Sequence, residues 1–149
     1  MPKFDEIDKE ILRLLQIDGR MPYKDIAEKI NKAPATVKNR ISKMMEMGII
    51  RAFVPLLNYK ILGYNLSAII MIQAKPGKLN DLIDMTIKEG TLTAVYEITG
   101  EYDVILIGRF KDEEHLSSFI RKLLDSGAVE RTVTSMVMKT HKEDPRIPI

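Results

Sequence analysis

Two short helical patterns joined by a tight turn occupy residues 22–50 and restrict how the chain can fold. The first pattern ends at Ile30, the second begins at Pro34, and Gly48 ends the second. Helices joined by so short a turn cannot lie antiparallel and must cross steeply. The segment therefore predicts a helix-turn-helix, which presents its second helix to the DNA major groove.

The predicted solvent side of the second helix is polar and basic, with no carboxylate before Glu46. Residues 29–51 hold six basic side chains and one acidic side chain, a local charge of +5, whereas the whole chain carries +2. Basic charge on one helix is typical of a phosphate-contacting surface, although a solvated helix face can look the same. We expect the basic members of the following set to hold phosphates and the others to reach base edges: Thr36, Lys38, Asn39, Arg40, Ser42 and Lys43.

Apolar residues at spacings of three and four predict a further helix from Phe4 to Leu15. The three helices then share a small core, to which the second and third contribute Ile26, Ala27, Ile30, Val37, Ile41 and Met44, with Met45 as a further candidate. Residues 49–57 are apolar and β-prone, but Pro55 restricts them to an edge strand or an extended connector.

The second half of the chain changes its hydrophobic period and predicts the order βαββαβ. The predicted strands are residues 66–74, 92–99, 104–110 and 129–140, with helices after the first and third. This order is the ferredoxin-like plan, so the fold class is α+β with an N-terminal winged helix-turn-helix. We expect a DNA-binding domain at 1–52, a connecting strand or hinge at 53–65, a ferredoxin-like domain at 66–141 and an irregular tail at 142–149.

The predicted sheet looks apolar on both faces. Two helices can cover only one face, and a sheet with one wet face should alternate apolar and polar residues. Residues 69–72 and 104–107 are continuously apolar instead. We therefore expect the same face of a second subunit to cover the second face in a two-fold dimer, the alternative being cover by the other domain or the tail.

Composition excludes several other classes. At 45% hydrophobic and 30% charged residues, the chain is typical of a soluble globular protein, and it has no run of 18 apolar residues that could span a membrane. Cysteine is absent, and His115 and His141 are the only histidines. We therefore expect a cytoplasmic protein without disulfides, thiolate chemistry or a metal site. We also expect no cofactor and no enzymatic activity.

The order of the two modules and their motifs resembles the Lrp/AsnC family, also called the leucine-responsive or feast/famine regulators. The N-terminal motifs are Asp8-Lys9-Glu10-Ile11-Leu12, Asp18-Gly19-Arg20, Asp25-Ile26-Ala27 and Val37-Lys38-Asn39-Arg40-Ile41 running to Gly48-Ile49-Ile50. The C-terminal motifs are Thr99-Gly100-Glu101-Tyr102-Asp103 and the archaeal-type ending Val129-Glu130-Arg131-Thr132-Val133-Thr134. The chain departs from the family at Lys32-Ala33, where an apolar residue and a capping serine often precede the third helix.

The resemblance implies a transcriptional regulator that binds double-stranded operator DNA. It also implies C-terminal modules that pair into a homodimer and often assemble into tetramers or octamers. A small effector, usually an amino acid, is expected to bind between these modules. Carried onto this chain, the effector residues are Thr99, Gly100, Tyr102, Asp103, Thr132 and Thr134.

The chemistry of these residues is compatible with an amino-acid effector. Gly100 lets backbone N–H groups approach a carboxylate, and Asp103 can pair with an ammonium group. Thr132 and Thr134 point to the same face of a strand, so both hydroxyls can converge on one ligand. The same residues are also ordinary hairpin and strand residues.

Three other functions fit parts of the pattern. A sirohaem decarboxylase can share this architecture, but it needs a histidine in the C-terminal cavity, and neither His115 nor His141 is well placed. A ferredoxin-like RNA binder stacks bases on exposed strand aromatics, and here only Tyr96 and Phe110 lie in the predicted central strands. A DNA-binding architectural protein without an effector is the third alternative.

Overall fold

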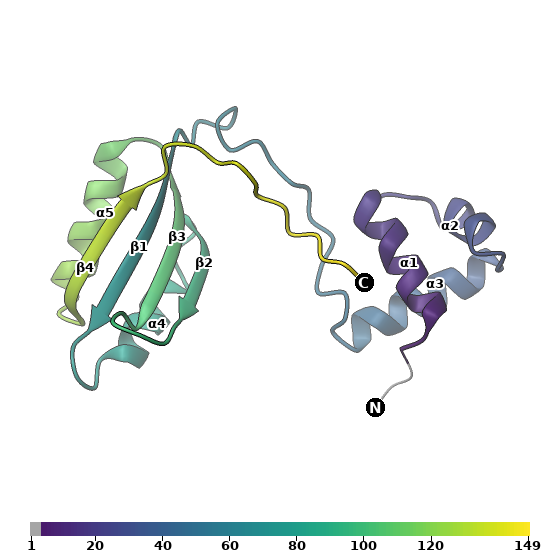
Figure 1. Ribbon diagram of the computed structural model, residues 1–149, viewed down its shortest axis with the longest axis horizontal. Coiled ribbons are helices and arrows are strands. Elements are labelled where there is room, and N and C mark those ends of the chain that lie inside the picture. The colour runs from purple at the N-terminus through teal and green to yellow at the C-terminus, as the bar shows by residue number, and fades with distance from the viewer. Residues whose placement is uncertain (1–3) are drawn as a thin grey trace. The chain divides into compact units, whose positions relative to one another are not determined.

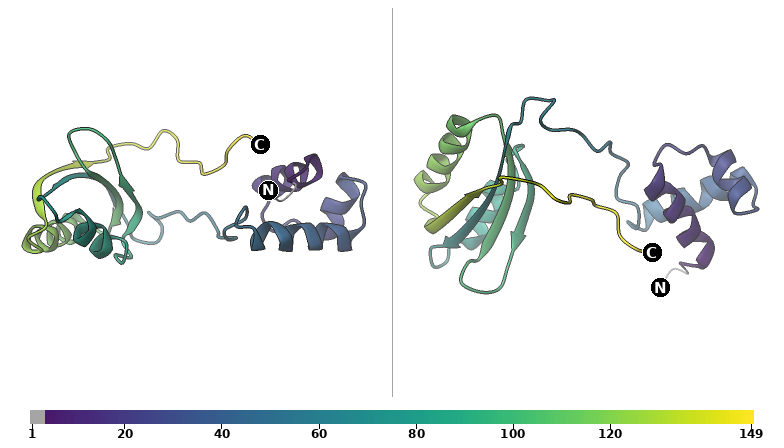
Figure 2. Two further views of the ribbon diagram at one scale, coloured as in Figure 1. Left: turned by 90° about the horizontal axis from the view of Figure 1, so that it is seen from below. Right: turned by 45° about the horizontal axis from the view of Figure 1, so that its top comes forward.

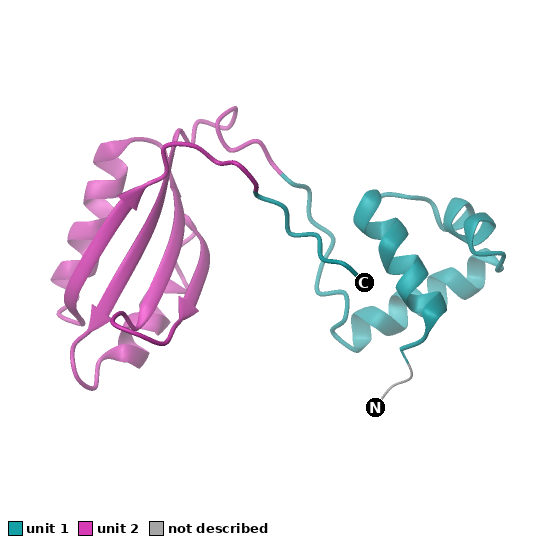
Figure 3. Cartoon of the chain, in the orientation of Figure 1, with its two compact units in different colours: residues 1–56, 143–149 teal, residues 57–142 magenta. Residues whose placement is uncertain are grey.

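The structure, a computed structural model, describes residues 4–149, and its contacts divide the chain into two units (Figure 1, Figure 3). The first unit runs to Leu56 and takes in Glu143–Ile149, and the second is Leu57–Lys142. No helix formed by residues 4–149 has the length and apolar content that a membrane span requires.

Three helices form the core of the first unit: α1 (Glu6–Ile17), α2 (Tyr23–Lys29) and α3 (Pro34–Glu46). The predicted trihelical core is confirmed, with buried Ile11 of α1, Ile26 and Ala27 of α2, and Val37 and Ile41 of α3 in one cluster. Each helix contributes one apolar stripe because residues three and four apart lie on the same face.

Two details of this core differ from the prediction. Helix α1 starts at Glu6 rather than at Phe4, because Asp5 caps it: the Asp5 carboxylate accepts the Asp8 N–H at 3.1 Å, and the Asp8 carboxylate accepts the Asp5 N–H at 3.1 Å. Met45 does not join the core and keeps 46% of its surface exposed. Successive side chains on a helix point about 100° apart, so Met45 points toward solvent when Met44 points into the core.

The segment after α3 is the extended connector that the sequence allowed. Gly48 has a φ of +71° and ends α3 in a left-handed cap. Residues 51–58 form neither helix nor strand, and their large apolar side chains are exposed: Phe53, Val54, Leu56 and Leu57. A turn at residues 59–63 then leads toward the second unit's first strand.

The second unit confirms the order βαββαβ. Its elements are β1 (Leu66–Ala74), α4 (Leu79–Thr86), β2 (Leu92–Glu97), β3 (Val104–Phe110), α5 (Glu113–Asp125) and β4 (Val129–Met136). The strands form one antiparallel sheet in the order β2-β3-β1-β4, with β1 and β3 at its centre. Strands β2 and β4 end earlier than predicted, at Glu97 and Met136.

Helices α4 and α5 lie on the same side of the sheet (Figure 2). Beneath them the strands are fully buried at alternating positions, as at Ile70, Ile72, Val104 and Leu106. The expectation that both faces are buried is not met within one chain. The second face keeps Ile69 and Tyr96 exposed, at 37% and 55%, because no helix of this unit covers that side.

Candidate DNA-binding and effector sites

Helix α3 is held by its apolar stripe, which fixes the side that it presents to solvent. Val37, Ile41 and Met44 are buried. Four of the six predicted DNA-contacting side chains are exposed on the rest of the helix: Lys38, Asn39, Ser42 and Lys43. Thr36 is half-buried near the start of the helix. The arrangement leaves two lysines and two hydrogen-bonding side chains free to approach a duplex.

The start of α3 is organised without a side-chain cap. Ala33 occupies the N-cap position and makes no side-chain hydrogen bond, while Pro34 follows as the first helical residue. Proline lacks the N–H that would be left without a partner there, and its fixed φ suits the first turn. The departure from the family pattern at Lys32-Ala33 is therefore compatible with a regular start of α3.

The sixth predicted residue, Arg40, has partners inside the chain instead of facing outward. Its Nη1 donates to Asp5 Oδ1 at 2.8 Å, Asp5 Oδ2 at 2.9 Å and Asp8 Oδ1 at 2.9 Å. Asp8 is buried, and the Arg40 guanidinium holds the pKa of the Asp5 carboxyl below its ordinary value, mainly through its hydrogen bond. We call Arg40, Asp5 and Asp8 the α1–α3 clamp. This side chain ties α3 to the start of α1 through Nη1, so we expect Arg40 to be less available to a phosphate than Lys38 and Lys43.

Replacing Arg40 with alanine should lower the free energy of unfolding of the first unit by about 1–3 kcal/mol, because it leaves the buried Asp8 carboxylate without its charged partner. The loss should be full at neutral pH and should shrink below about pH 4. The pKa of Asp5 is lowered in the folded state, so its contribution exists above the unfolded pKa and disappears as the pH falls through the folded one. Urea unfolding followed by circular dichroism measures both effects.

Lys38→Ala is the matched control for this experiment, because it removes one cation from the same helix without breaking an ion pair among residues 4–149. Equal stability of the Arg40→Ala variant and the unaltered protein at neutral pH would show that the clamp contributes nothing.

Four of the predicted effector residues lie in the β2–β3 loop, which meets the end of β1. The loop carries Thr99, Gly100, Tyr102 and Asp103. Gly100 has a φ of +122°, a region that favours glycine. The Asp103 N–H donates to the Ile72 carbonyl oxygen at 2.9 Å. The loop is thus fixed to the central strand of the sheet at this level.

Asp103 makes a second bond to the same strand. Its Oδ2 accepts the Ala74 N–H at 2.8 Å, which gives this carboxylate a structural partner in addition to the ammonium group expected for it. Its other oxygen, Oδ1, remains the atom that can meet a ligand cation.

The other two predicted effector residues, Thr132 and Thr134, lie on β4, which pairs with β1 on the side away from β3. Thr132 pairs with Ile72 and Thr134 with Ile70, so both hydroxyls point to the side that carries the helices. The Thr132 Oγ1 is buried and has no hydrogen-bond partner among the described residues, whereas Thr134 is exposed. A buried hydroxyl without a partner is unusual and is a place where a ligand atom or a water can bind.

Two arginines of the sheet were not singled out from the sequence. Arg131 Nη1 donates to Glu101 Oε1 at 2.9 Å, and its guanidinium lies over the Tyr102 ring at 5.7 Å, so β4 contacts the β2–β3 loop. Arg109 is buried, donates from Nη1 to Ser67 Oγ at 2.6 Å and lies under the Tyr59 ring at 4.9 Å. The sequence pattern could have singled out only Arg109, because a charged residue there interrupts an otherwise apolar strand.

The uncovered side of the sheet, which we call the open face, is formed by alternate residues of all four strands. Its centre is the cross-strand pair of Ile69 with Ile107, next to the pair of Met71 with Ile105. Ala94, Tyr96 and Val133 extend it on β2 and β4. A contiguous apolar surface of this kind is unusual on a soluble monomer.

Neither histidine lies among the predicted effector residues. His115 is in the first turn of α5, where its N–H donates to the Asp112 carboxylate at 2.8 Å and its ring meets Phe110 edge-on. His141 is exposed and follows the end of β4.

Comparison with known proteins places both units in one family. The family model "Winged helix-turn-helix DNA-binding" matches residues 4–51, and the model "Lrp/AsnC ligand binding domain" matches residues 67–147. An HTH-type transcriptional regulator of Pyrococcus furiosus is 40% identical over 145 residues, covering 97% of this chain and 98% of that protein. The HTH-type transcriptional regulator FL11 of Pyrococcus abyssi is 39% identical over 145 residues, covering 97% of this chain and 96% of that protein.

A solved structure agrees with these matches along nearly the whole chain. A transcriptional regulator of Neisseria meningitidis, determined as a complex with L-Met, superposes with a TM-score of 0.91 at 26% identity, covering 98% of this chain and 97% of that one. This chain belongs to the Lrp/AsnC family of transcriptional regulators, with a winged helix-turn-helix followed by an Lrp/AsnC ligand-binding domain.

Proposed function

We propose that this protein is a sequence-specific regulator that binds double-stranded DNA through α3 as a homodimer and responds to a small effector, an amino acid. The observation that supports DNA binding most directly is the solvent side of α3. Lys38, Asn39, Ser42 and Lys43 are exposed there together, while the opposite side of the helix is buried. With Arg40 in the α1–α3 clamp, the two lysines are the proposed phosphate contacts and Asn39 and Ser42 the proposed base contacts.

A dimer is proposed because of the open face. In a two-fold dimer the Ile69–Ile107 pair of one subunit would meet the same pair of the other, which removes the exposed apolar surface from water. Two subunits also supply two copies of α3, which on one side of a duplex would contact half-sites about 34 Å apart or a multiple of it. Further assembly into a tetramer or octamer is part of the same proposal.

An amino acid is the proposed effector class. The Neisseria meningitidis regulator that superposes on this chain was determined with L-Met bound. The loop residues Gly100 and Asp103, together with the buried Thr132 hydroxyl, supply the backbone N–H, carboxylate and hydroxyl groups that an α-amino acid needs.

Selection of genomic fragments bound by the purified protein, repeated with each of the common amino acids, tests this function. We expect a small set of fragments that share a half-site and whose recovery changes with one amino acid or a few related ones. Recovery of random fragments would contradict sequence specificity. Specific fragments that respond to none of the amino acids would support the effector-independent architectural alternative.

Replacing Thr132 with valine should separate effector binding from stability. Valine keeps the shape and removes the buried hydroxyl, which has no partner among the described residues, so the chain should be as stable as before or slightly more stable. The effector concentration at the midpoint of the change in DNA binding should rise about tenfold if this hydroxyl contacts the ligand. DNA binding without effector should be unchanged.

Titration of DNA binding with the active amino acid measures the shift, and Thr140→Val, at an exposed position after β4, is the matched control. An unchanged midpoint in the Thr132→Val variant would remove this residue from the effector site.

A further inference from the structure

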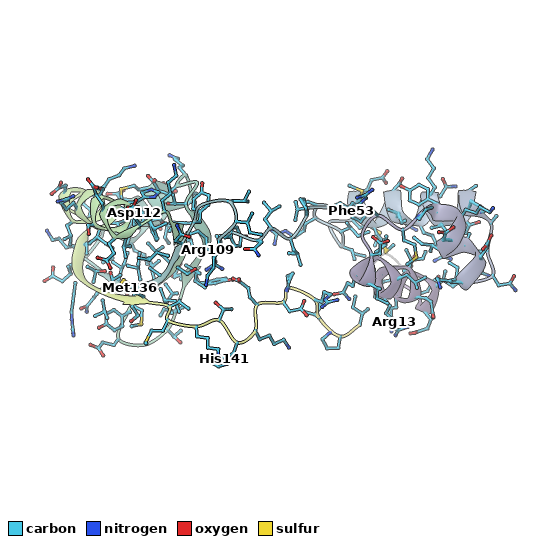
Figure 4. All side chains as sticks on the ribbon, turned by 90° about the horizontal axis from the view of Figure 1, so that it is seen from above. Arg13, Phe53, Arg109, Asp112, Met136 and His141 are labelled. Carbon is cyan, nitrogen blue, oxygen red and sulfur yellow. The ribbon has the colours of Figure 1, made fainter. Side chains whose placement is uncertain are left out.

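The end of the tail, at Ile147 and Ile149, is bound by two side chains of α1, and Figure 4 labels one of them, Arg13. The Gln16 amide pairs with the backbone of Ile147: Nε2 donates to the carbonyl oxygen at 2.9 Å, and the Ile147 N–H donates to Oε1 at 2.9 Å. Arg13, almost one helical turn earlier, donates from Nε to the backbone oxygen of Ile149 at 2.8 Å. Gln16 therefore pairs with the tail as a neighbouring strand would.

The tail is prepared for this contact by its own residues. Pro145 and Pro148 stand on either side of Arg146 and Ile147, and each fixes its φ. The Asp144 carboxylate accepts two hydrogen bonds from the Arg146 guanidinium, at 2.9 and 3.0 Å, and one from the Arg146 N–H at 3.0 Å. A segment with few accessible conformations loses little entropy when it binds.

We propose that Arg13 and Gln16 form a docking site on α1 for residues 145–149, and that docking restrains the DNA-binding unit. The chain leaves this unit after Leu56 and comes back to it at Glu143, so the docked tail is a second connection to the rest of the protein, held on α1 by hydrogen bonds. Neither side chain belongs to α3 or to the effector loop. The site is thus separate from the two sites described above.

The restraint should affect the affinity for DNA with paired half-sites, an inference that rests on the proposed function. A dimer gains affinity from two half-sites only to the extent that its second unit is already held near the second half-site. A DNA-binding unit with one connection explores more orientations than a unit with two. Undocking should therefore weaken binding to paired half-sites and leave binding to a single half-site unchanged.

Amide hydrogen exchange at Ile147 in the full-length protein tests the docking itself. Because this N–H donates to Gln16 Oε1, it should exchange slowly in the unaltered protein and at least about tenfold faster in Gln16→Ala. Alanine is a strong helix former, so α1 should keep its helix content. Glu28→Ala, an exposed helical substitution in the same unit that does not touch the tail, should leave the Ile147 rate unchanged. Equal rates in Gln16→Ala and the unaltered protein would overturn the docking site.

Duplexes with one or two copies of the half-site recovered from the selected fragments test the restraint. Gln16→Ala should lose about tenfold in affinity for the paired duplex only. An unchanged affinity for the paired duplex, or an equal loss on both duplexes, would overturn the restraint. If the unaltered protein binds neither duplex, the proposed function fails, and the exchange experiment still decides whether the tail docks.

Discussion

Replacing both Lys38 and Lys43 with alanine should lower the affinity for operator DNA by two to three orders of magnitude at about 0.15 M salt. Each phosphate contact contributes about 0.9 to the slope of log K against log salt concentration. A dimer loses four lysines, so the slope should become less steep by about 3.6 if all four contact phosphates. Both lysines are exposed and make no ion pair among residues 4–149, so their removal should leave the fold intact.

The matched control is the double variant Lys88→Ala and Lys111→Ala, which removes the same charge from exposed positions of the second unit. Its affinity should fall far less, because long-range attraction is screened beyond about 8–10 Å. Fluorescence anisotropy at several salt concentrations measures affinity and slope together. If the Lys38/Lys43 variant and the control give the same slope, α3 is not the surface that contacts phosphates.

Lys38 and Lys43 are exposed, whereas Arg40 of the same helix is paired with two carboxylates, and this difference shows how far the sequence can locate a DNA-binding surface. Arg40 lies three residues after Val37 and four before Met44, so it shares their side of the helix. Two carboxylates, Asp5 and Asp8, stand at the start of the helix that packs on this side. Both signals were present in the sequence, but helical spacing alone does not tell which helix a side chain meets.

The element order of the second unit was predictable because its hydrophobic period changes from two to about 3.6 and its turns carry glycine. The ends of β2 and β4 were not, since Thr99 and Thr140 are suitable strand residues without a strand partner at their positions. Strand pairing depends on the neighbouring strand, which single-sequence patterns do not show.

The effector residues illustrate the same limit. Alternation correctly predicted that Thr132 and Thr134 share a face, and the register with Ile70 and Ile72 places that face on the helix side. Nothing in the local sequence showed that Asp103 would bind the end of β1, because Ala74 is 29 residues away. Contacts between distant segments had to come from the structure.

Replacing Ile107 with lysine should convert the proposed dimer to monomers. Ile107 lies opposite Ile69 at the centre of the open face, so a two-fold dimer would bring its copies close together and bury two unpaired charges. An unpaired charge at a buried interface costs several kcal/mol, which corresponds to a rise in the dimer dissociation constant of about two orders of magnitude or more. Sedimentation equilibrium measures this constant directly.

The substitution tests the interface without testing the core, because the open face and the helix-covered face alternate along β3. Leu106, the next residue, is fully buried under the helices, and a lysine there should unfold the unit. Ile87→Lys, at an exposed isoleucine at the end of α4, is the matched control and should remain dimeric. An Ile107→Lys variant that is folded and still dimeric would show that the subunits associate through another surface.

Loss of the dimer should also remove the advantage of paired half-sites over a single one, because each α3 would then bind alone.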